Sequence, residues 1–321
     1  MTRVFVYEQS ACREASAVDP AWLQPGSPVM FWVDLAAPTP EEGRLLSDVF
    51  HFHELAVEDA MSEIHHPKIE SYDSYLYLIL HGIDFQASEE GFATHDIDFF
   101  LGPNYLVTVH DGTSRSIESH YHVCLRNAHA IGEGPAALLH RIVDAMVDHY
   151  RPEVERLEEC VDKLETRVFE EPDHNPIREL IQVKKDLASL RRVTLPQRDA
   201  VSRLARREFS QIPETVSWRM RDVYDHLVRL SDESIMLHDR VASLLEAFLS
   251  AQSNRLNQVM KLMTVIATIF MPLTVLTGMF GMNVELPHMP GPPWMEFWWI
   301  TGLMLVISAG MLYMFRRSRW L

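Results

Sequence analysis

The chain has 321 residues, of which 47% are hydrophobic and 23% are charged, and its mean hydropathy is −0.08. Its net charge of −16 argues against a nucleic-acid-binding protein, because such proteins need a basic face. The averages hide a division at Lys261. From Lys261 to Leu321 there are four basic and two acidic residues, so this end carries +2 and residues 1–260 carry −18.

Residues 1–134 are predicted to form an α/β domain. Short apolar runs bounded by turn residues predict strands at 4–7, 30–35, 75–80, 97–101 and 105–110, with Gly102-Pro103-Asn104 as a tight connection between the last two. Helices are expected at 41–50 and 54–60, and Thr39-Pro40 marks the start of the first.

Residues 135–261 are predicted to be long helices that form a stalk. Apolar residues at three- and four-residue steps indicate helices at 136–169 and 177–208, the first with a break near Tyr150 because Pro152 follows. A third helix is expected from Glu214 to Phe280, where the only Pro or Gly residues are Pro272 and Gly278. Its positions 223, 227, 230, 234, 237, 241, 244 and 248 form a heptad seam.

Residues 262–321 are predicted to form a transmembrane hairpin. Residues 262–280 and 297–315 are two uncharged runs of 19 residues, and each spans about 28 Å as a helix, close to the hydrocarbon thickness. The short loop 284–296 between them has no Lys or Arg, whereas basic residues flank the other ends. Basic flanks favour the cytoplasm, so both termini are expected there, in the cytoplasmic membrane. The first residues have no apolar run of signal-peptide length, so export of the soluble part is not expected, and the three scattered cysteines fit a reducing compartment.

One face of the first span has an unusual composition. Four- and three-residue steps from Asn257 pass only through small, weakly polar or flexible residues, namely Asn257, Met260, Thr264, Ala267, Met271, Thr274, Gly278 and Gly281. We call this set the pore-face stripe. Small residues allow close helix packing, but an uncharged stripe of this kind also suits a conduit in which a cation keeps most of its water. The composition alone does not separate these two interpretations.

The span ends in Gly281-Met282-Asn283, and here the sequence resembles the CorA family of divalent-cation channels, which has a Gly-Met-Asn triplet at this point. Residues 252–254, 267–274, 221–226 and 67–70 and the basic tail ending in Arg319-Trp320-Leu321 also match the family pattern, so the resemblance covers essentially the whole chain. The protein is not expected to be an enzyme, because the sequence contains no P-loop, dinucleotide fingerprint or nucleophile elbow.

The resemblance implies a CorA-like homopentameric funnel, with the first span of each subunit around a central pore and no cofactor apart from Mg²⁺ as transported and regulatory ion. Gly281, Met282 and Asn283 would form the selectivity filter, and Glu285 would lie at the outer mouth. The pore-face stripe would line the pore. Amide oxygens of a ring of Asn283 side chains can accept hydrogen bonds from the hydration shell of Mg²⁺, an ion that loses its water reluctantly.

The resemblance also implies a regulatory Mg²⁺ site in the cytoplasm between adjacent subunits. Asp222 matches one ligand through Arg221-Asp222-Val223-Tyr224-Asp225-His226, and Asp84 is the candidate for its partner. Two departures bear on ion selectivity. Phe280 stands where the family usually has Tyr, and the loop reads Met289-Pro290-Gly291-Pro292 where an acid is common.

Two other interpretations remain open. The first is a zinc-type CorA relative, coupled to protons, although its usual loop sequence is absent. The second is a non-conducting, membrane-anchored metal sensor. The leading interpretation is a passive, Mg²⁺-gated channel for Mg²⁺, with Co²⁺ and Ni²⁺ as further substrates. The sixteen histidines include the pairs 51/53, 65/66 and 120/122, but none has the spacing expected of a transition-metal site.

Overall fold

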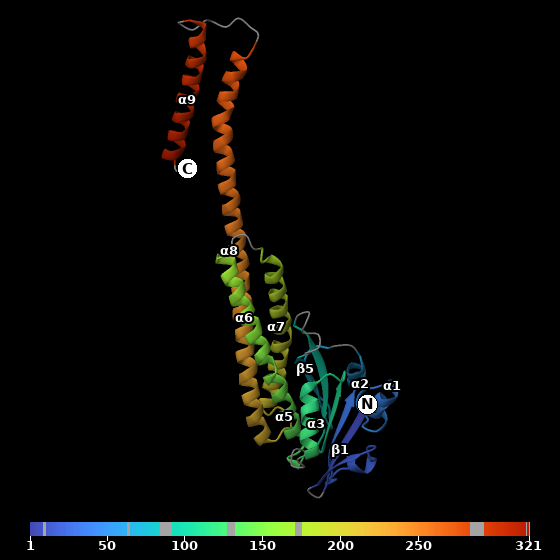
Figure 1. The fold of residues 1–321 in the computed structure, drawn as a ribbon. Coiled ribbons are helices and arrows are strands. Elements are labelled where there is room, and N and C mark those ends of the chain that lie inside the picture. Colours follow the sequence, from blue (N-terminus) through green and yellow to red (C-terminus); the bar gives the residue numbers. More distant parts are fainter. Residues whose placement is uncertain are drawn as a thin grey trace. The chain divides into compact units, whose positions relative to one another are not determined.

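The computed structural model of the chain describes residues 1–8, 11–62, 65–83, 92–126, 132–170, 175–282, 292–318 and 320. The chain divides into two compact units, Met1–Leu244 and Leu245–Leu321. Helix α8 (Glu214–Phe280) runs through both. The predicted fold class is confirmed: an α/β domain, a long helix and two apolar helical segments at the C-terminal end (Figure 1).

The α/β domain is built on a seven-stranded sheet with the order β2-β1-β3-β7-β6-β5-β4. The strands are β1 (Thr2–Glu8), β2 (Ala11–Ala15), β3 (Met30–Ala36), β4 (Lys68–Ser71), β5 (Leu76–Ile83), β6 (Thr94–Leu101) and β7 (Tyr105–His110). Among these described strands, the pairing of β3 with β7 is parallel and the others are antiparallel. All five predicted strands are present, and Gly102 N donates to Tyr105 O in the tight turn between β6 and β7.

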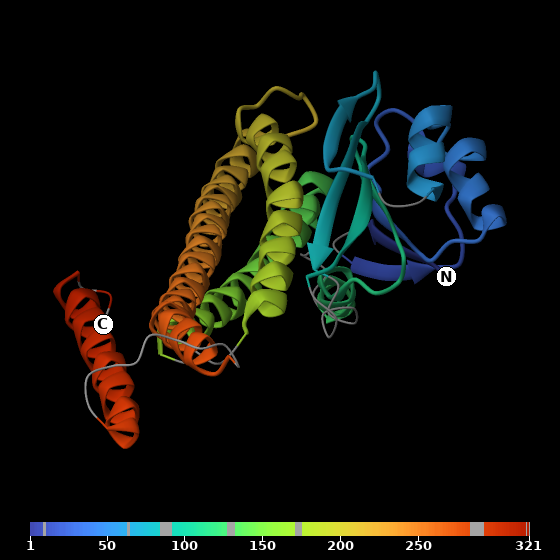
Figure 2. The same cartoon turned by 90° about the horizontal axis from the view of Figure 1, so that it is seen from above.

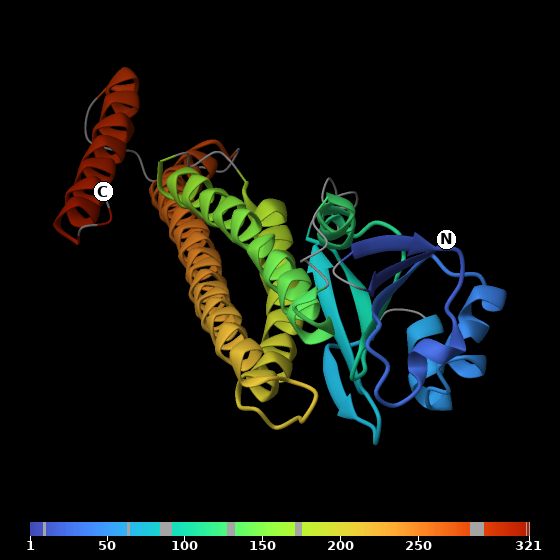
Figure 3. The same cartoon turned by 90° about the horizontal axis from the view of Figure 1, so that it is seen from below.

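Helices cover both faces of this sheet (Figures 2 and 3). On one face, α1 (Pro40–Asp48) and α2 (Glu54–Met61) close an aromatic and aliphatic core. Helix α1 begins at a capping box in which Glu42 N donates to Thr39 Oγ1 and Thr39 N donates to Glu42 Oε2, as the Thr39-Pro40 start predicted. The other face carries α3 (Arg115–Arg126) and α5 (Pro135–Asp148), and a short 3₁₀ turn, η1 (Pro20–Leu23), precedes β3.

Three long helices follow the α/β domain: α6 (Tyr150–Glu170), α7 (Ile177–Ala205) and the first part of α8. The break near Tyr150 is confirmed, since α5 ends at Asp148 and α6 begins at Tyr150. Every position of the predicted heptad seam of α8, from Val223 to Phe248, is buried. Ser234, the one polar seam residue, donates its hydroxyl to Ser231 O at 2.8 Å. Arg240 of α8 forms ion pairs with Asp162 at 2.8 Å and Glu165 at 2.6 Å on α6.

The C-terminal unit contains the end of α8 and helix α9 (Pro293–Arg317). Both helices are long and apolar enough to cross a membrane. Their most apolar windows have mean hydropathies of 2.0 and 1.6, and only 6% and 0% of those windows is buried within the chain. An apolar helix that is not buried by its own chain differs from the core helix of a soluble protein. The predicted hairpin therefore fits the described residues.

Candidate ion pathway and metal sites

The pore-face stripe is exposed along its whole length in the single chain. Each of its eight residues, from Asn257 to Gly281, belongs to the exposed class. The same steps counted backwards along α8 also pass only through exposed residues, which are Ser253, Ser250, Glu246, Ser243, Asp239, Met236, Asp232, Arg229 and Asp225. The stripe therefore belongs to one uncovered line on α8, which changes from charged in the stalk to uncharged in the apolar span.

Burial in the apolar span falls on the other side of α8. Val265 is 4% exposed, and the partly buried residues of the span are Thr268, Ile269, Pro272, Leu273 and Leu276. None of these belongs to the stripe. Helix geometry places Val265 and Ile269 on nearly the opposite side from Ala267 and Met271. Within the described part of the chain, no helix therefore packs closely against the small residues of the stripe.

The threonine hydroxyls of the stripe are oriented by the helix itself. Thr264 Oγ1 donates to Met260 O at 2.7 Å and Thr274 Oγ1 donates to Phe270 O at 2.9 Å. Because these hydroxyl protons are used within the helix, the oxygens are left with lone pairs that can accept hydrogen bonds from water. A hydrated cation presents water protons outward, so such oxygens suit its passage without removal of its water.

The predicted filter lies at the point where α8 ends. Gly281 N donates to Thr277 O at 2.9 Å and Met282 N donates to Met279 O at 3.4 Å. A Cβ at Gly281 would lie 2.9 Å from Thr277 O, a backbone atom with little room to move, so this turn needs glycine. Asn283, the proposed selectivity residue, and Glu285 lie outside the described residues.

Asp222, the predicted regulatory ligand, is exposed on α8 and lies near Asp144 of α5. Burial raises the pKa of the Asp144 carboxyl, the neighbouring imidazoles of His140 and His226 oppose this shift, and the carboxylates of Asp148 and Asp222 add to it. Sequence reasoning did not select Asp144. The available indication was the pair Asp144 and Asp148, one turn apart on a mainly apolar helix. Asp84 lies outside the described residues.

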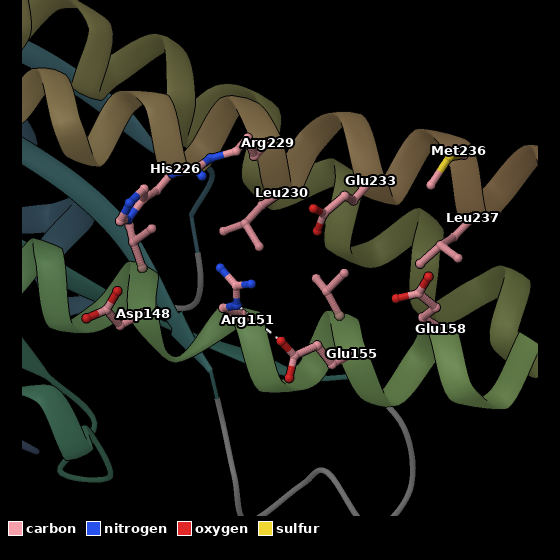
Figure 4. Close-up of a pocket in the computed structure, with 12 residues that line it drawn as sticks. Asp148, Arg151, Glu155, Glu158, His226, Arg229, Leu230, Glu233, Met236 and Leu237 are labelled. Atoms are coloured by element: carbon pink, nitrogen blue, oxygen red, sulfur yellow. Dashed lines mark hydrogen bonds and ion pairs between the residues drawn. The ribbon is translucent and has the colours of Figure 1, made fainter.

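A groove of about 300 Å³ lies beside this acidic group, between α8 and the end of α5 with α6 (Figure 4). Asp148, Glu155, Glu158 and Glu233 line it together with the cations Arg151 and Arg229. Arg151 Nε is 3.1 Å from Glu155 Oε1, so part of the acidic charge is neutralised. The mixture of signs gives the groove no clear preference for a cation.

The described residues contain no group of three or more His, Cys, Asp and Glu side chains arranged to hold a metal ion. Three histidines of these pairs have other partners. His51 Nδ1 lies 3.1 Å from Ser47 O, and His53 Nδ1 accepts from Leu55 N at 3.2 Å. His122 Nε2 lies 3.4 Å from Glu118 Oε1. Asp222 and Asp144 alone do not complete a site within this part of one chain.

Comparisons with known proteins show which family the chain resembles. The family described as CorA-like Mg²⁺ transporter proteins matches residues 28–317. A cobalt/magnesium transport protein CorA of Thermotoga maritima is 30% identical over 281 residues, covering 86% of this chain and 79% of that protein. A zinc transport protein ZntB of Yersinia pseudotuberculosis is 26% identical over 311 residues, covering 96% of this chain and 90% of that protein.

A solved structure of a CorA protein has the same fold as this chain. The solved structure of the CorA magnesium transporter of Methanocaldococcus jannaschii superimposes with a TM-score of 0.83 at 21% identity, covering 100% of this chain and 99% of that chain. The family match begins at residue 28 and extends over strands β3 to β7 of the α/β domain, the long helices and both apolar helices. The chain belongs to the family of CorA-like Mg²⁺ transporter proteins.

Proposed function

We propose that the protein is a passive divalent-cation channel that mediates Mg²⁺ uptake across the cytoplasmic membrane, with Co²⁺ and Ni²⁺ as further substrates. The observation that carries this proposal is the pore-face stripe. In a member of this family, an apolar span exposes one continuous line without charge and without Leu, Ile, Val or Phe. An uncharged, uncluttered face allows a hydrated ion to pass without binding too tightly to leave.

The channel is a homopentamer in this proposal, with α8 of each copy around the axis and α9 outside it. In this proposal both termini lie in the cytoplasm and the short loop between the spans lies outside, which is the orientation that the distribution of basic residues favours. Five chains of 37.0 kDa give a mass of about 185 kDa. Native mass spectrometry of the purified protein measures this number directly, and a stable monomer would count against the pentamer.

Selectivity resides in the ring of Asn283 side chains in this proposal, with Gly281 and Met282 completing the filter and Glu285 concentrating cations at the outer mouth. Mg²⁺ keeps several waters in protein sites. An amide oxygen accepts a hydrogen bond from this hydration shell, whereas a carboxylate would hold the ion more strongly and slow its release. Met260 and Met271 form flexible apolar constrictions, and Pro272, which removes a helix hydrogen bond, allows α8 to bend.

Gating by cytoplasmic Mg²⁺ uses Asp222 in this proposal. Asp222 is exposed, and it lies close enough to the Asp144 carboxyl to raise its pKa. A site with ligands from an adjacent subunit, with Asp84 as the candidate partner, would hold the interface together when Mg²⁺ is bound. Loss of the ion would leave like charges facing one another and loosen the interface.

Flux measurements test the channel. Liposomes that contain the protein and a Mg²⁺-sensitive dye are expected to take up Mg²⁺ when the interior is made negative. Asn283→Ala is expected to lower the rate about ten-fold or more, because one lost hydrogen bond of about 1.4 kcal/mol already changes a rate ten-fold. Asn175→Ala is the matched control, since Asn175 only caps α7 by accepting from Ile177 N at 3.2 Å.

The same flux assay determines which ion the protein prefers and whether transport is coupled to protons. The similarity to a zinc transport protein over 96% of the chain makes zinc transport the second candidate. Preferential uptake of Zn²⁺ in competition with Mg²⁺, Co²⁺ and Ni²⁺, together with dependence on a pH gradient, would favour that candidate. Absence of flux for every ion, with no effect of Asn283→Ala, would leave a membrane-anchored metal sensor.

A further inference from the structure

Two of the three cysteines, far apart in the sequence, lie on elements that pack against each other. Cys12 is on the edge strand β2 and Cys124 is on helix α3, and this strand and this helix are in contact. Both side chains are reduced. Cys12 is partly buried, and Cys124 is 1% exposed. We call these two residues the thiol pair.

The side chain of Cys12 lies on the face of β2 that meets α3. Tyr121 Oη of α3 donates to Glu14 Oε1 of β2 at 2.9 Å. Phe5, which pairs with Glu14 between β1 and β2, has its ring 5.1 Å from the ring of Tyr121. Side chains two residues apart in a strand point to the same face, so Cys12 faces α3 as Glu14 does.

Cys12 and Cys124 also lie at one level along α3. The helix runs beside β1 in the same direction, since Arg3 Nη1 donates to Glu118 Oε2 at 2.8 Å one turn before the ring contact. The next residue on this face of β1 is Tyr7, and one turn further along α3 is Cys124. Tyr7 pairs with Cys12 in the register of β1 and β2. The register therefore brings Cys12 opposite Cys124.

The electrostatics of the thiol pair agree with this placement. Burial raises the pKa of the Cys124 thiol to about 12, and the charge of a Cys12 thiolate adds to that shift. Burial is also the main cause that raises the pKa of Cys12, and the carboxylate of Glu14 adds to it. Both groups are thus thiols at neutral pH. Because the thiolate is the reactive form, the thiol pair stays reduced in a reducing compartment.

We propose that the thiol pair is an oxidation site that closes into a disulfide when hydrogen peroxide reaches the α/β domain. The thiolate of Cys12, the more exposed of the two, attacks the peroxide, so that the O–O bond breaks, hydroxide leaves and a sulfenic acid forms. The sulfur of Cys124 then attacks the Cys12 sulfur, its proton leaves with the hydroxyl group as water, and the S–S bond forms. In total, two thiols and one hydrogen peroxide give one disulfide and two waters.

The disulfide would anchor the edge of the sheet. Strand β2 pairs with β1 along one side, and its described contact with α3 includes a hydrogen bond between the exposed Glu14 and Tyr121. A covalent link between residues so far apart in the chain restricts the unfolded chain and so stabilises the folded α/β domain. This inference does not require that the protein conducts ions.

Peptide mass spectrometry of the full chain in detergent tests the proposal, after treatment with hydrogen peroxide, denaturation and alkylation. We expect a peptide that contains Cys12 linked to a peptide that contains Cys124, and release of both by dithiothreitol. The rate should rise roughly ten-fold per pH unit while Cys12 is mainly a thiol. The oxidised protein should unfold at a temperature about 5 °C or more above that of the reduced protein.

Cys160→Ser is the matched control and should form the link at the rate of the wild-type protein. Cys12→Ser and Cys124→Ala should lose both the link and the rise in unfolding temperature. Three results in the wild-type protein, which need no variant to fold, would overturn the proposal. These are alkylation of both cysteines after peroxide treatment, conversion of Cys12 to a sulfinic acid without a link, and a link between two chains, seen as a dimer in non-reducing electrophoresis.

Discussion

Asp98 on β6 is an acidic residue inside the core of the α/β domain. It is 5% exposed, and Tyr77 Oη donates a hydrogen bond of 2.5 Å to its carboxylate. Burial raises the pKa of Asp98 to about 8; the Tyr77 hydrogen bond opposes this shift, and the charges of Asp96 and Asp59 add to it. The folded protein therefore retains on Asp98 a proton that the unfolded chain releases near pH 4.

Stability should consequently fall as the pH rises from about 4 to about 8. Below this window Asp98 is protonated in both the folded and the unfolded state. Above it, Asp98 is charged in both states, and burial of the charge lowers the free energy of unfolding by its full amount. Asp98→Asn keeps the acceptor for Tyr77 and removes the charge. We expect it to raise the thermal unfolding midpoint at pH 8 by about 5 °C or more, with no gain near pH 4.

The measurement is thermal unfolding of the full chain in detergent across this pH range. Asp73→Asn is the matched control, because Asp73 is exposed and lies just before the same sheet region. A gain of equal size at pH 4 and pH 8 would show that the substitution improves packing and that titration of Asp98 is not the cause. The sequence alone does not reveal this residue, since His95-Asp96-Ile97-Asp98 shows two acids of which only one is buried.

At the scale of elements, the longest helix was predicted most accurately. Helix α8 begins at Glu214 and ends at Phe280, as predicted. It is continuous because Pro272 and Gly278 are the only helix-breaking residues in a strong apolar pattern. Pro272 does not end the helix, since its missing N–H removes a single hydrogen bond from a continuous apolar span. The heptad seam was likewise readable, because each of its positions is buried.

Among the described residues, strands β2 and β4, helix α3 and the short turn η1 were missed, the first three for identifiable reasons. Strand β2 is an edge strand without a buried residue, and β4 is a four-residue edge strand with one, so neither has an apolar run long enough to recognise. Helix α3 has only Ile117, Cys124 and Ser116 buried among twelve residues, and its polar, histidine-rich sequence resembles a loop. Pairing with β1 and β5 and packing on α5 decide these elements, and such long-range contacts are not visible in local sequence.

The pore-face stripe gives a prediction at the scale of the helix. Ala267 is exposed on the stripe, and Ile269, two residues later, lies on nearly the opposite, partly buried side. After replacement of Cys12, Cys124 and Cys160, a cysteine at position 267 should face water and react with a cationic methanethiosulfonate reagent. The adduct would place a fixed positive charge in the ion path. We expect Ala267→Cys to lose Mg²⁺ flux in liposomes upon treatment, down to the rate of protein-free liposomes.

Ile269→Cys is the matched control for this experiment and should keep its flux after treatment, because a thiol against lipid or helix is not converted to thiolate and does not react. Equal inhibition of the two variants would contradict the assignment of the stripe to the pore. Inhibition of Ile269→Cys alone would place the ion path on the other face of α8.

At the scale of the molecule, the exposed line of residues on α8 is available for contact with other copies of the chain. Asp225, Asp232, Asp239 and Glu246 lie on it one heptad apart, below the uncharged stripe. In the proposed ring of five chains, the pore-face stripe of each copy would face the axis, and the acidic residues would lie on the cytoplasmic continuation of the same helix. The charge of −18 on residues 1–260 would then serve to gather divalent cations on the cytoplasmic side. Without a cation, the like charges of adjacent copies would repel one another.

Asp222 should therefore couple Mg²⁺ to the stability of the assembly. Mg²⁺ bound between subunits stabilises the bound form in proportion to its concentration, so it should slow proteolysis of the long helices in the wild-type protein. We expect Asp222→Ala to need roughly ten-fold more Mg²⁺ for equal protection, since removal of one charged ligand costs on the order of 1.4 kcal/mol or more. The measurement is the rate of trypsin cleavage across a Mg²⁺ titration.

Asp225→Ala is the matched control for this experiment. It removes the same charge from an exposed position of the same helix, three residues later, but Asp222, and not Asp225, is among the main groups that shift the pKa of Asp144. If both variants lose protection equally, Mg²⁺ acts through the general acidity of the stalk, and the specific assignment of Asp222 is wrong. If only Asp222→Ala loses protection, Mg²⁺ binds at the junction of α5 and α8. There the carboxylates of Asp144 and Asp222 from one chain would need further ligands from the adjacent chain.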